Sequence, residues 1–179
     1  MIHPTAEVSD HSIIGKNTKI WHQAQVRERS KIGSNCIISK GVYIDSGVKI
    51  GDNVKIQNYS SIYHGASIEG GVFIGPHVII ANDKFPRAVN KDGTLKSESD
   101  WQCGKVLIKK GASIGAGSII LPDVTIGSFA LIGAGSVVTK NVPDNALVVG
   151  SPAKHRGFVC SKGHKTQDKN CPICNEKIE

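Results

Sequence analysis

An aliphatic residue recurs at every sixth position along most of this chain. The series runs from Ile2 to Ile80 without exception, and a second series runs from Ile108 to Val138. A six-residue period does not fit an α-helix, because the apolar residues would wander around the 3.6-residue turn instead of forming one stripe. The residue two places before each aliphatic is small or β-branched, and alternate inward residues of this kind suit a short β-strand. Gly, Asn and Asp between the strands suit turns.

Three such six-residue sides make one triangular coil, and stacked coils make a parallel β-helix. The two series contain 14 and 6 sides, which predicts 20 sides and nearly seven coils. At about 4.8 Å per coil the prism would be roughly 30 Å tall. We therefore expect an all-β domain over residues 1–157, followed by a short tail over residues 158–179 that abandons the repeat.

The period is lost after Ile80. The next aliphatic position would be Pro86, and the series that resumes at Ile108 is out of phase with the first in steps of six. Residues 81–105 are predicted to leave the prism as a loop, and so long a loop favours a functional role over a tolerated surface insertion. Asn82 follows His64 by three full sides, so the two should stack at one corner of adjacent coils. The same count places Tyr59 beneath His77.

The segment NVPDNALVVGSPAK, from Asn141 to Lys154, resembles the closing signature of the hexapeptide-repeat acyltransferases. The resemblance covers residues 1 to about 157. It implies a left-handed coil, acetyl-CoA as the cosubstrate, and a homotrimer with active sites between neighbouring prisms.

The segments KIQNYSSIYHGASIEGGVFIGPHVIIANDKFPRA and VLIKKGASIGAGSIILPDVTIGSFALIGAGSVVTK are similar to bacterial sugar-nucleotide N-acetyltransferases. The nearest are the UDP-2-acetamido-3-amino-2,3-dideoxyglucuronate N-acetyltransferases, with the dTDP-3-amino-3,6-dideoxyhexose enzymes close behind. The likeness implies acetylation of the 3-amino group of a nucleotide-linked sugar in the synthesis of surface polysaccharide such as O-antigen. It also implies that Asn82, which opens the family's N-x-x-x-P-R-A motif, lies at the sugar.

Acetyl transfer to an amine needs a group that accepts the amine's proton and donors that stabilise the developing oxyanion. His64 is the candidate base, because it is expected at the mouth of the loop and because imidazoles titrate near neutral pH. Proton transfer to water is the alternative, with His64 an ordinary turn residue. A backbone amide near the IGAGS segments is the candidate oxyanion donor, since glycine permits close approach of a ligand.

Cationic and small residues supply the candidate binding groups. Arg87, Lys109 and Lys110 could meet a carboxylate or diphosphate of the substrate, and Tyr63 is a further candidate beside His64. Two GAG segments one coil apart could leave a groove for a pantetheine arm, although coil turns need small residues in any case. The candidate coenzyme-binding residues are Gly115, Ala116, Gly117, Gly133, Ala134, Gly135, Lys140, Pro152 and Lys154.

The tail carries the pattern C-x3-H-x6-C-x2-C, formed by Cys160, His164, Cys171 and Cys174. Four such ligands suffice for a closed tetrahedral zinc site, and a metal would fold so short a segment. A structural zinc is therefore expected, against the alternative of a flexible tail. The total of five cysteines is odd and argues for reduced thiols, and Cys36 should fill an inward slot of the repeat.

Charge and other patterns narrow the function classes. The net charge of +7 is scattered, with no basic run interleaved with aromatics, so an acidic small ligand explains it as well as nucleic acid does. Nothing resembles a signal peptide or membrane span, and we expect a cytoplasmic protein. Three alternatives stay open: an acyltransferase for another small acceptor, a γ-carbonic-anhydrase-like metalloenzyme, and a non-catalytic scaffold. The metalloenzyme would need a pair of histidines in the pattern H-x4-H, which the chain lacks.

Overall fold

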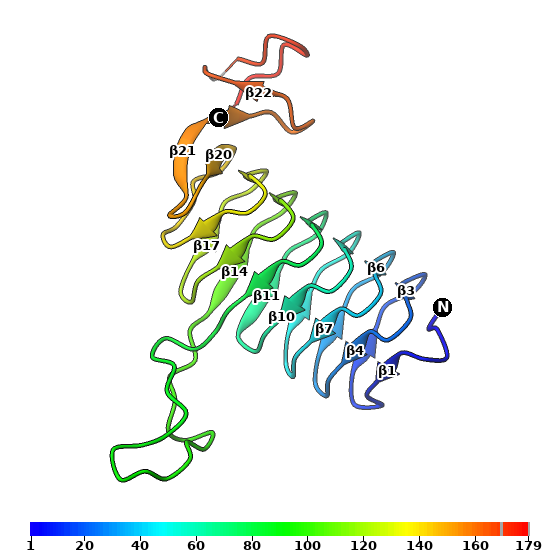
Figure 1. Cartoon of the computed structure of the whole chain (residues 1–179). Helices are drawn as coiled ribbons and strands as arrows, with labels where there is room; N and C mark the ends of the chain where they lie inside the picture. Colours follow the sequence, from blue (N-terminus) through cyan, green and yellow to red (C-terminus); the bar gives the residue numbers. More distant parts are fainter. Residues whose placement is uncertain (169, 179) are drawn as a thin grey trace.

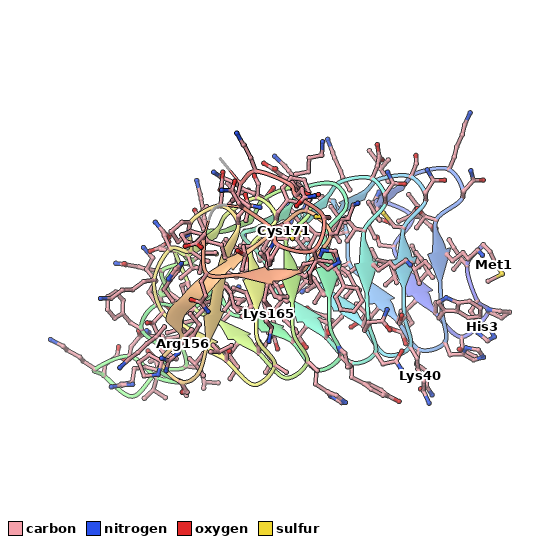
Figure 2. All side chains as sticks on the ribbon, turned by 90° about the horizontal axis from the view of Figure 1, so that it is seen from above. Met1, His3, Lys40, Arg156, Lys165 and Cys171 are labelled. Atoms are coloured by element: carbon pink, nitrogen blue, oxygen red, sulfur yellow. The ribbon has the colours of Figure 1, made fainter. Side chains whose placement is uncertain are left out.

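The chain forms a prism of stacked three-sided coils from which one long loop extends (Figure 1). The computed structural model describes residues 1–168 and 170–178. Met1 and His3 lie at one end of the prism, and Arg156 lies toward the other (Figure 2). Among the described residues, no helix is long and apolar enough to cross a membrane.

The three faces of the prism are three β-sheets, which the chain visits in the order A, B, C. Sheet A contains β3 (Lys19–Ile20), β6 (Ile37–Ile38), β9 (Lys55–Ile56), β12 (Phe73–Ile74), β15 (Ser113–Ile114), β18 (Leu131–Ile132), β20 (Ala146–Val149), β21 (Lys154–Val159) and β22 (Lys165–Thr166). Sheet B contains β1 (Glu7–Val8), β4 (Gln25–Val26), β7 (Tyr43–Ile44), β10 (Ser61–Ile62), β13 (Ile79–Ile80), β16 (Ile119–Ile120) and β19 (Val137–Val138). Sheet C contains β2 (Ile13–Ile14), β5 (Lys31–Ile32), β8 (Lys49–Ile50), β11 (Ala66–Ile68), β14 (Val106–Ile108) and β17 (Thr125–Ile126).

Strands of neighbouring coils pair in parallel at a spacing of three sides, as Ile62 does with Ile80. Across the loop Ile80 pairs with Ile120, so the loop more than doubles the length of this one coil. The predicted left-handed parallel β-helix is confirmed. The prism has about eight turns, slightly more than the nearly seven predicted, because sheet A also includes the parallel bridge of Ile2 to Ile20 at one end and β20 at the other. The predicted boundary at residue 157 falls inside β21, which continues from the prism into the tail.

The sixth-position aliphatics line the axis of the prism. The isoleucines of β3 to β18 at this position are almost all fully buried, and Cys36 fills its inward slot with no exposed surface. Burial of each such side chain contributes on the order of 1.5–3 kcal/mol. Inward hydroxyls are satisfied by the backbone: Ser60 donates to the Gly75 carbonyl at 2.8 Å and accepts from the Val78 amide at 3.2 Å.

Most sides of the prism end in a residue with left-handed backbone conformation, three positions after the inward aliphatic. Glycine supplies many of these corners, but asparagine and larger residues also occur, including Arg29, Tyr59 and His77. A non-glycine residue in this conformation costs about 1–2 kcal/mol, so the stacked coils must impose it. The predicted stacking of Tyr59 beneath His77 is confirmed, with ring centroids 5.5 Å apart.

A second group of glycines is required by the spacing between coils. Gly33 follows the inward Ile32, and a Cβ there would lie 2.6 Å from the carbonyl carbon of Gly51 in the next coil. Gly135, by contrast, is a left-handed corner whose Cβ would point into open space. Gly33 is therefore required by the packing between coils, whereas Gly135 is a corner position with space for a side chain.

The substitution Gly33→Asn should lower the free energy of unfolding by about 1–3 kcal/mol, because its side chain overpacks the space between two coils. Gly135→Asn is the matched control. Asparagine already occupies this corner conformation at Asn17 and Asn53, so we expect a smaller loss than for Gly33→Asn, at most about 1 kcal/mol. Denaturant unfolding of both variants checks this, and equal loss in the two would refute the steric explanation.

Candidate functional site

The loop leaves and re-enters the prism at the edge between sheets B and C, the B/C edge. Its two ends pair with each other: Asp83 bridges Cys103 in antiparallel fashion, and the Gly104 amide donates to the Asn82 carbonyl at 2.7 Å. The next coil holds this base from the other side. There Asp123 pairs with the ammonium of Lys84 and accepts the Lys105 amide at 3.0 Å.

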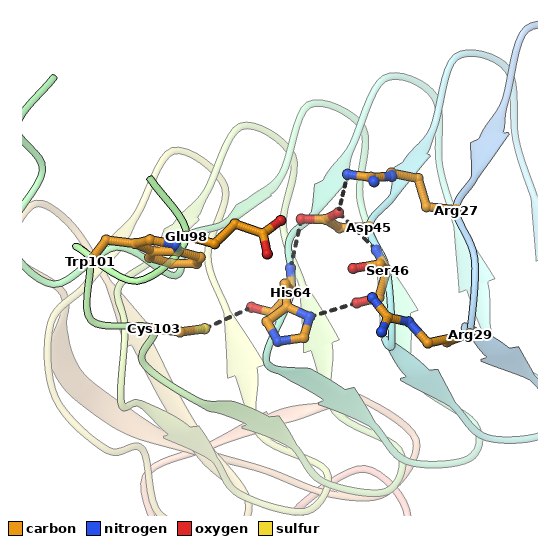
Figure 3. A pocket seen from close by; sticks show the side chains of 8 residues that line it. All are labelled: Arg27, Arg29, Asp45, Ser46, His64, Glu98, Trp101 and Cys103. Atoms are coloured by element: carbon orange, nitrogen blue, oxygen red, sulfur yellow. Dashed lines mark hydrogen bonds and ion pairs between the residues drawn. The ribbon is translucent and has the colours of Figure 1, made fainter. Parts of the chain in front are cut away.

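A pocket of about 410 Å³ lies between the loop and the B/C edge (Figure 3). The loop contributes an aromatic ring, a carboxylate and a thiol, and three coils of the prism contribute the other side. The lining residues are Arg27, Arg29, Asp45, Ser46, His64, Glu98, Trp101 and Cys103.

The His64 ring is held in one tautomer. Its Nδ1 lies 2.7 Å from the carbonyl oxygen of Ser46, one coil away. A carbonyl oxygen only accepts, so Nδ1 carries the hydrogen and Nε2 of the neutral ring keeps the lone pair. The His64 amide donates to Asp45 at 3.1 Å, and the Cys103 thiol donates to the His64 carbonyl at 3.5 Å. The ring therefore has the orientation and the tautomer that a general base requires.

Asp45 organises the floor of the pocket. Its carboxylate accepts from the Tyr43 hydroxyl at 3.0 Å, from the Ser46 amide at 2.7 Å and from Arg27 at 3.3 Å. Burial raises the pKa of Tyr43, and the hydrogen bond to Asp45 acts in the same direction against the lowering effect of Arg27. The phenol thus stays protonated and donates to the carboxylate.

The two arginines differ in their freedom to meet a ligand. Arg27 is tied to Asp45 and also to Glu28, whose oxygen lies 2.9 Å from it. Arg29 has 75% of its side chain exposed and approaches Glu28 only at 4.0 Å. Arginine presents a planar fork that suits phosphate and carboxylate groups, so Arg29 is the cation best placed to bind an anionic ligand in this pocket.

The predicted catalytic pair is only partly brought together. Asn82 is one coil above His64 by the strand register, but it lies at the base of the loop with its carbonyl engaged by Gly104. The His64 pocket is instead closed by Trp101 and Cys103. Tyr63 lies next to His64, 37% exposed, with its ring tilted against Tyr43 at a centroid distance of 5.6 Å.

The predicted cationic substrate residues lie in different places. Arg87 is exposed on the loop, where its guanidinium donates to the Pro86 carbonyl at 2.8 Å. Lys109 and Lys110 follow β14 and therefore lie at the edge between sheets C and A. There Lys109 approaches Asp144 at 3.5 Å. Within a single chain, these lysines therefore lie on a different edge from the His64 pocket.

The GAG segments lie on a third edge, where sheet A leads into sheet B (the A/B edge). Gly117 and Gly135 are open left-handed corners, and Ala116 and Ala134 are exposed beside them. A Cβ on Gly115 would lie 2.7 Å from the Ala134 Cα. Gly115 is thus required by coil packing, and so is Gly133, whose Cβ would overlap Val149.

The remaining predicted coenzyme residues border the last coil. Lys140 follows β19 on the B/C edge, and Pro152 and Lys154 lie in and after the turn between β20 and β21. Sheet B separates the A/B edge, which carries the GAG corners, from the B/C edge, which carries His64. The candidate base and the candidate coenzyme groove therefore occupy opposite margins of one face.

Several pocket residues were not predicted from the sequence. Arg27, Asp45 and Tyr63 occupy equivalent positions in three successive coils. Ser46 and His64 are likewise equivalent in two successive coils. The same count that joined His64 to Asn82 could therefore have found them. Glu98, Trp101 and Cys103 belong to the aperiodic loop. Of these three residues, only Cys103 could have been found by counting. Ile68 pairs with Ile108, and His64 and Gly104 precede these two residues by the same number of positions. Gly104 therefore stacks above His64, and Cys103 is its neighbour.

The four predicted tail ligands do come together. The sulfur atoms of Cys160, Cys171 and Cys174 and a ring nitrogen of His164 all lie within 4.8 Å of one another. Burial opposes ionisation of the Cys171 thiol, but hydrogen bonds from the amides of Cys174 and Ile173, from the Cys174 thiol and from His164 outweigh it. They lower the pKa of Cys171 to about 6. The cluster could hold a metal ion.

The family described as "Bacterial transferase hexapeptide (six repeats)" matches residues 11–46, 47–82 and 105–140. These segments make up more than half of the chain. The chain therefore belongs to the bacterial hexapeptide-repeat transferases. A second description, "Hexapeptide repeat of succinyl-transferase", matches residues 30–63.

Individual relatives match shorter parts. The dTDP-3-amino-3,6-dideoxy-alpha-D-galactopyranose 3-N-acetyltransferase of Aneurinibacillus thermoaerophilus is 54% identical over 57 residues, 32% of this chain and 30% of that protein. A serine acetyltransferase of Buchnera aphidicola is 46% identical over 97 residues, 54% of this chain and 35% of that protein. The chain thus spans about a third of the length of these relatives.

Two solved structures resemble most of the chain. A mutant of AntD, an N-acyltransferase from Bacillus cereus in complex with dTDP and coenzyme A, is 25% identical with a TM-score of 0.58, covering 90% of this chain and 82% of that one. PerB from Caulobacter crescentus, in complex with CoA and GDP-perosamine, is 25% identical with a TM-score of 0.56, covering 87% and 56%.

The Lys84–Asp123 pair should hold the base of the loop closed. In Asp123→Asn the asparagine can keep the left-handed corner and the bond to the Lys105 amide but loses the charge, so hydrogen exchange of the Gly104 amide should become several-fold faster. Asp92→Asn, at a loop site whose carboxylate accepts the amide and the hydroxyl of Thr94, should leave that rate unchanged.

The closure of the loop base should depend on pH because of the same Lys84–Asp123 pair. The hydrogen bond from Lys84, and then that from the Lys105 amide, lower the pKa of Asp123. The stabilisation of the loop base by Asp123 is therefore complete above the ordinary carboxyl pKa of about 3.9. It is lost as the pH falls through the lower pKa that Asp123 has in the folded protein. Wild-type protein at lower pH should approach the behaviour of Asp123→Asn, and a pH-independent difference would contradict this.

Proposed function

We propose that the protein transfers the acetyl group of acetyl-CoA to the 3-amino group of a nucleotide-linked amino sugar in surface polysaccharide synthesis. The observation that carries the proposal is the pocket at the B/C edge, where His64 faces the inserted loop with Nε2 as its acceptor. The relatives include a sugar-nucleotide 3-N-acetyltransferase and a structure with CoA and GDP-perosamine bound. The cytoplasmic location expected from the sequence stays a prediction.

In this reaction the neutral sugar amine attacks the thioester carbonyl carbon of acetyl-CoA. Nε2 of His64 accepts a proton from the nitrogen as the new bond forms. A backbone amide of a GAG corner donates to the oxyanion of the tetrahedral intermediate. The intermediate collapses to the amide, the carbon–sulfur bond breaks, and the imidazolium returns the proton to the CoA thiolate.

The two sides of the pocket together suit a nucleotide. Trp101 offers an aromatic face on which a base can stack, and Arg29 offers an exposed guanidinium for the diphosphate. Arg87 and Asn82 are then left for the sugar, as the resemblance implies. Tyr63, Lys109 and Lys110 stay candidate substrate contacts.

We infer that the complete site lies between two copies of the chain in a homotrimer. The A/B edge would bind acetyl-CoA through Ala116, Gly117 and their equivalents one coil later, while the B/C edge of the next copy would supply His64. The separation of these edges by sheet B within one chain supports this arrangement. Two carboxylates, an aromatic ring and two cations around a hydrogen-bonded histidine favour catalysis over a scaffold role.

The experiment that tests the function measures release of free CoA with a panel of nucleotide-linked 3-amino sugars, other amino sugars, serine and galactosides. We expect turnover with the first group, and kcat for His64→Ala reduced by about 10²–10⁴-fold at an unchanged KM for acetyl-CoA. His22→Ala, at the N-terminal end against His3, is the control and should retain wild-type kcat. Turnover only with serine or a galactoside would favour another acceptor, and wild-type turnover by His64→Ala would leave the proton to water.

The shared site predicts complementation between inactive variants. Ala116→Trp should block the coenzyme groove at the A/B edge, and His64→Ala removes the base at the B/C edge. Refolding an equal mixture should restore about a quarter of the sites in a cyclic trimer, each built from two intact edges. If every site lay within one chain, the mixture would stay inactive, and a monomeric mass in solution would likewise refute the trimer.

A further inference from the structure

The tail that follows the prism holds its four ligand side chains at metal-binding distances. The Sγ atoms of Cys160 and Cys174 lie 3.7 Å apart, and the Sγ of Cys171 lies 3.7 Å from Nδ1 of His164. Zinc–sulfur bonds of about 2.3 Å at tetrahedral angles place two sulfurs about 3.8 Å apart. All three cysteines are free thiols, and Cys160 and Cys171 are 1% exposed. The spacing is therefore that of an edge of a tetrahedral site.

Two turns present these ligands to each other. In the first, the Gly163 amide donates to the Cys160 carbonyl at 2.8 Å, and the Cys160 amide donates to the His164 carbonyl at 3.1 Å. In the second, the Asn175 amide donates to the Cys171 carbonyl at 2.9 Å. Gly163 and Asn175 each take a left-handed conformation that reverses the chain. Each turn thus brings two ligands to the same side of its backbone.

A carboxylate joins the two turns. Glu176, beside the second turn, accepts the Ser161 amide at 2.9 Å and the Ser161 hydroxyl at 2.8 Å. Its backbone carbonyl accepts the Cys171 amide at 2.9 Å. The ligand set is therefore oriented by a polar frame of its own, as outer-shell bonds orient the ligands of metal sites.

The tail lacks an apolar core that could hold this arrangement alone. Among its described residues, the buried cluster consists of Cys160, Cys171 and Ile178, with Phe158 and Cys174 packed against them. Most members of this cluster are the thiol ligands themselves. A segment so short needs a metal or another cross-link to stay folded.

The tail also covers the end of a sheet. β21 pairs antiparallel with β20, and β22 pairs with β21, so together they occupy the edge at which sheet A of the prism ends (Figure 1). The Val159 amide donates to the Asn145 carbonyl at 2.8 Å, next to Cys160. An uncovered strand edge is a site for aggregation, so the position of Cys160 links the ligand cluster directly to this cap.

We propose that Cys160, His164, Cys171 and Cys174 bind one Zn²⁺ ion, and that this ion fastens β21 and β22 over the end of the prism. Four protein ligands close the coordination sphere, so the ion is structural and takes no part in the acyl transfer. Three thiolates and one imidazole select zinc over the oxygen-seeking Mg²⁺ and Ca²⁺.

The experiment uses the full-length protein purified without added chelator. Elemental analysis should find one zinc ion per chain, and Cys171→Ser should lose most of it. Cys36→Ser is the matched control, because the same inward slot holds serine at Ser30 and Ser60, and it should retain the metal. Co²⁺ added to the metal-free protein should give the absorption bands of a tetrahedral thiolate site. Absence of zinc together with absence of a Co²⁺ spectrum would overturn the metal site.

Hydrogen exchange tests the role of the ion. Chelation of wild-type protein should remove protection from the amides of β21 and β22, including the Phe158 and Val159 amides, while amides of β4 to β19 stay protected. Zinc that leaves without any loss of protection in the tail would overturn its role as the fastener of the cap. Collapse of protection throughout the prism would equally contradict a role confined to the cap.

Discussion

The fold depends on one backbone constraint, a left-handed residue at the end of most six-residue sides. This residue turns the chain through a corner of the triangle, and three such corners return it to the same face one coil later. Because a regular coil always takes three sides of equal length, side chains at equal positions stack in columns. His64 over Ser46 and His77 over Tyr59 are two such contacts. In these columns, residues separated by one full coil in the sequence come into contact.

This conversion explains how much the sequence predicted. The inward Ile and Val positions, the parallel pairing, the bounds of the loop and the stacking of Tyr59 with His77 all follow from counting in sides and coils. The tail ligands were predictable for a different reason, since the Cys/His spacing of two tight turns is itself the signal of a metal site.

The remaining parts of the site could not be predicted by counting along the repeat. Trp101 and Glu98 reach the pocket through a loop with no period, so their place depends on how Asp83 pairs with Cys103 at its base. The position of the two candidate lysines could not be predicted by counting either. Lys109 follows β14, a strand of sheet C. The inserted loop before this strand breaks the six-residue count, so counting alone does not show which edge of the prism Lys109 occupies.

A strictly periodic surface offers similar groups at every level and cannot by itself define one site. Chemistry therefore gathers where the period is broken. The loop closes a pocket over a column that would otherwise continue unchanged, and it turns Ser46 and His64 from stacked corner residues into one wall of that pocket. The tail ends the column of sheet A with two antiparallel strands and a cluster of thiols. The regular coils supply rigid spacing between edges, and the two interruptions determine what each edge can bind.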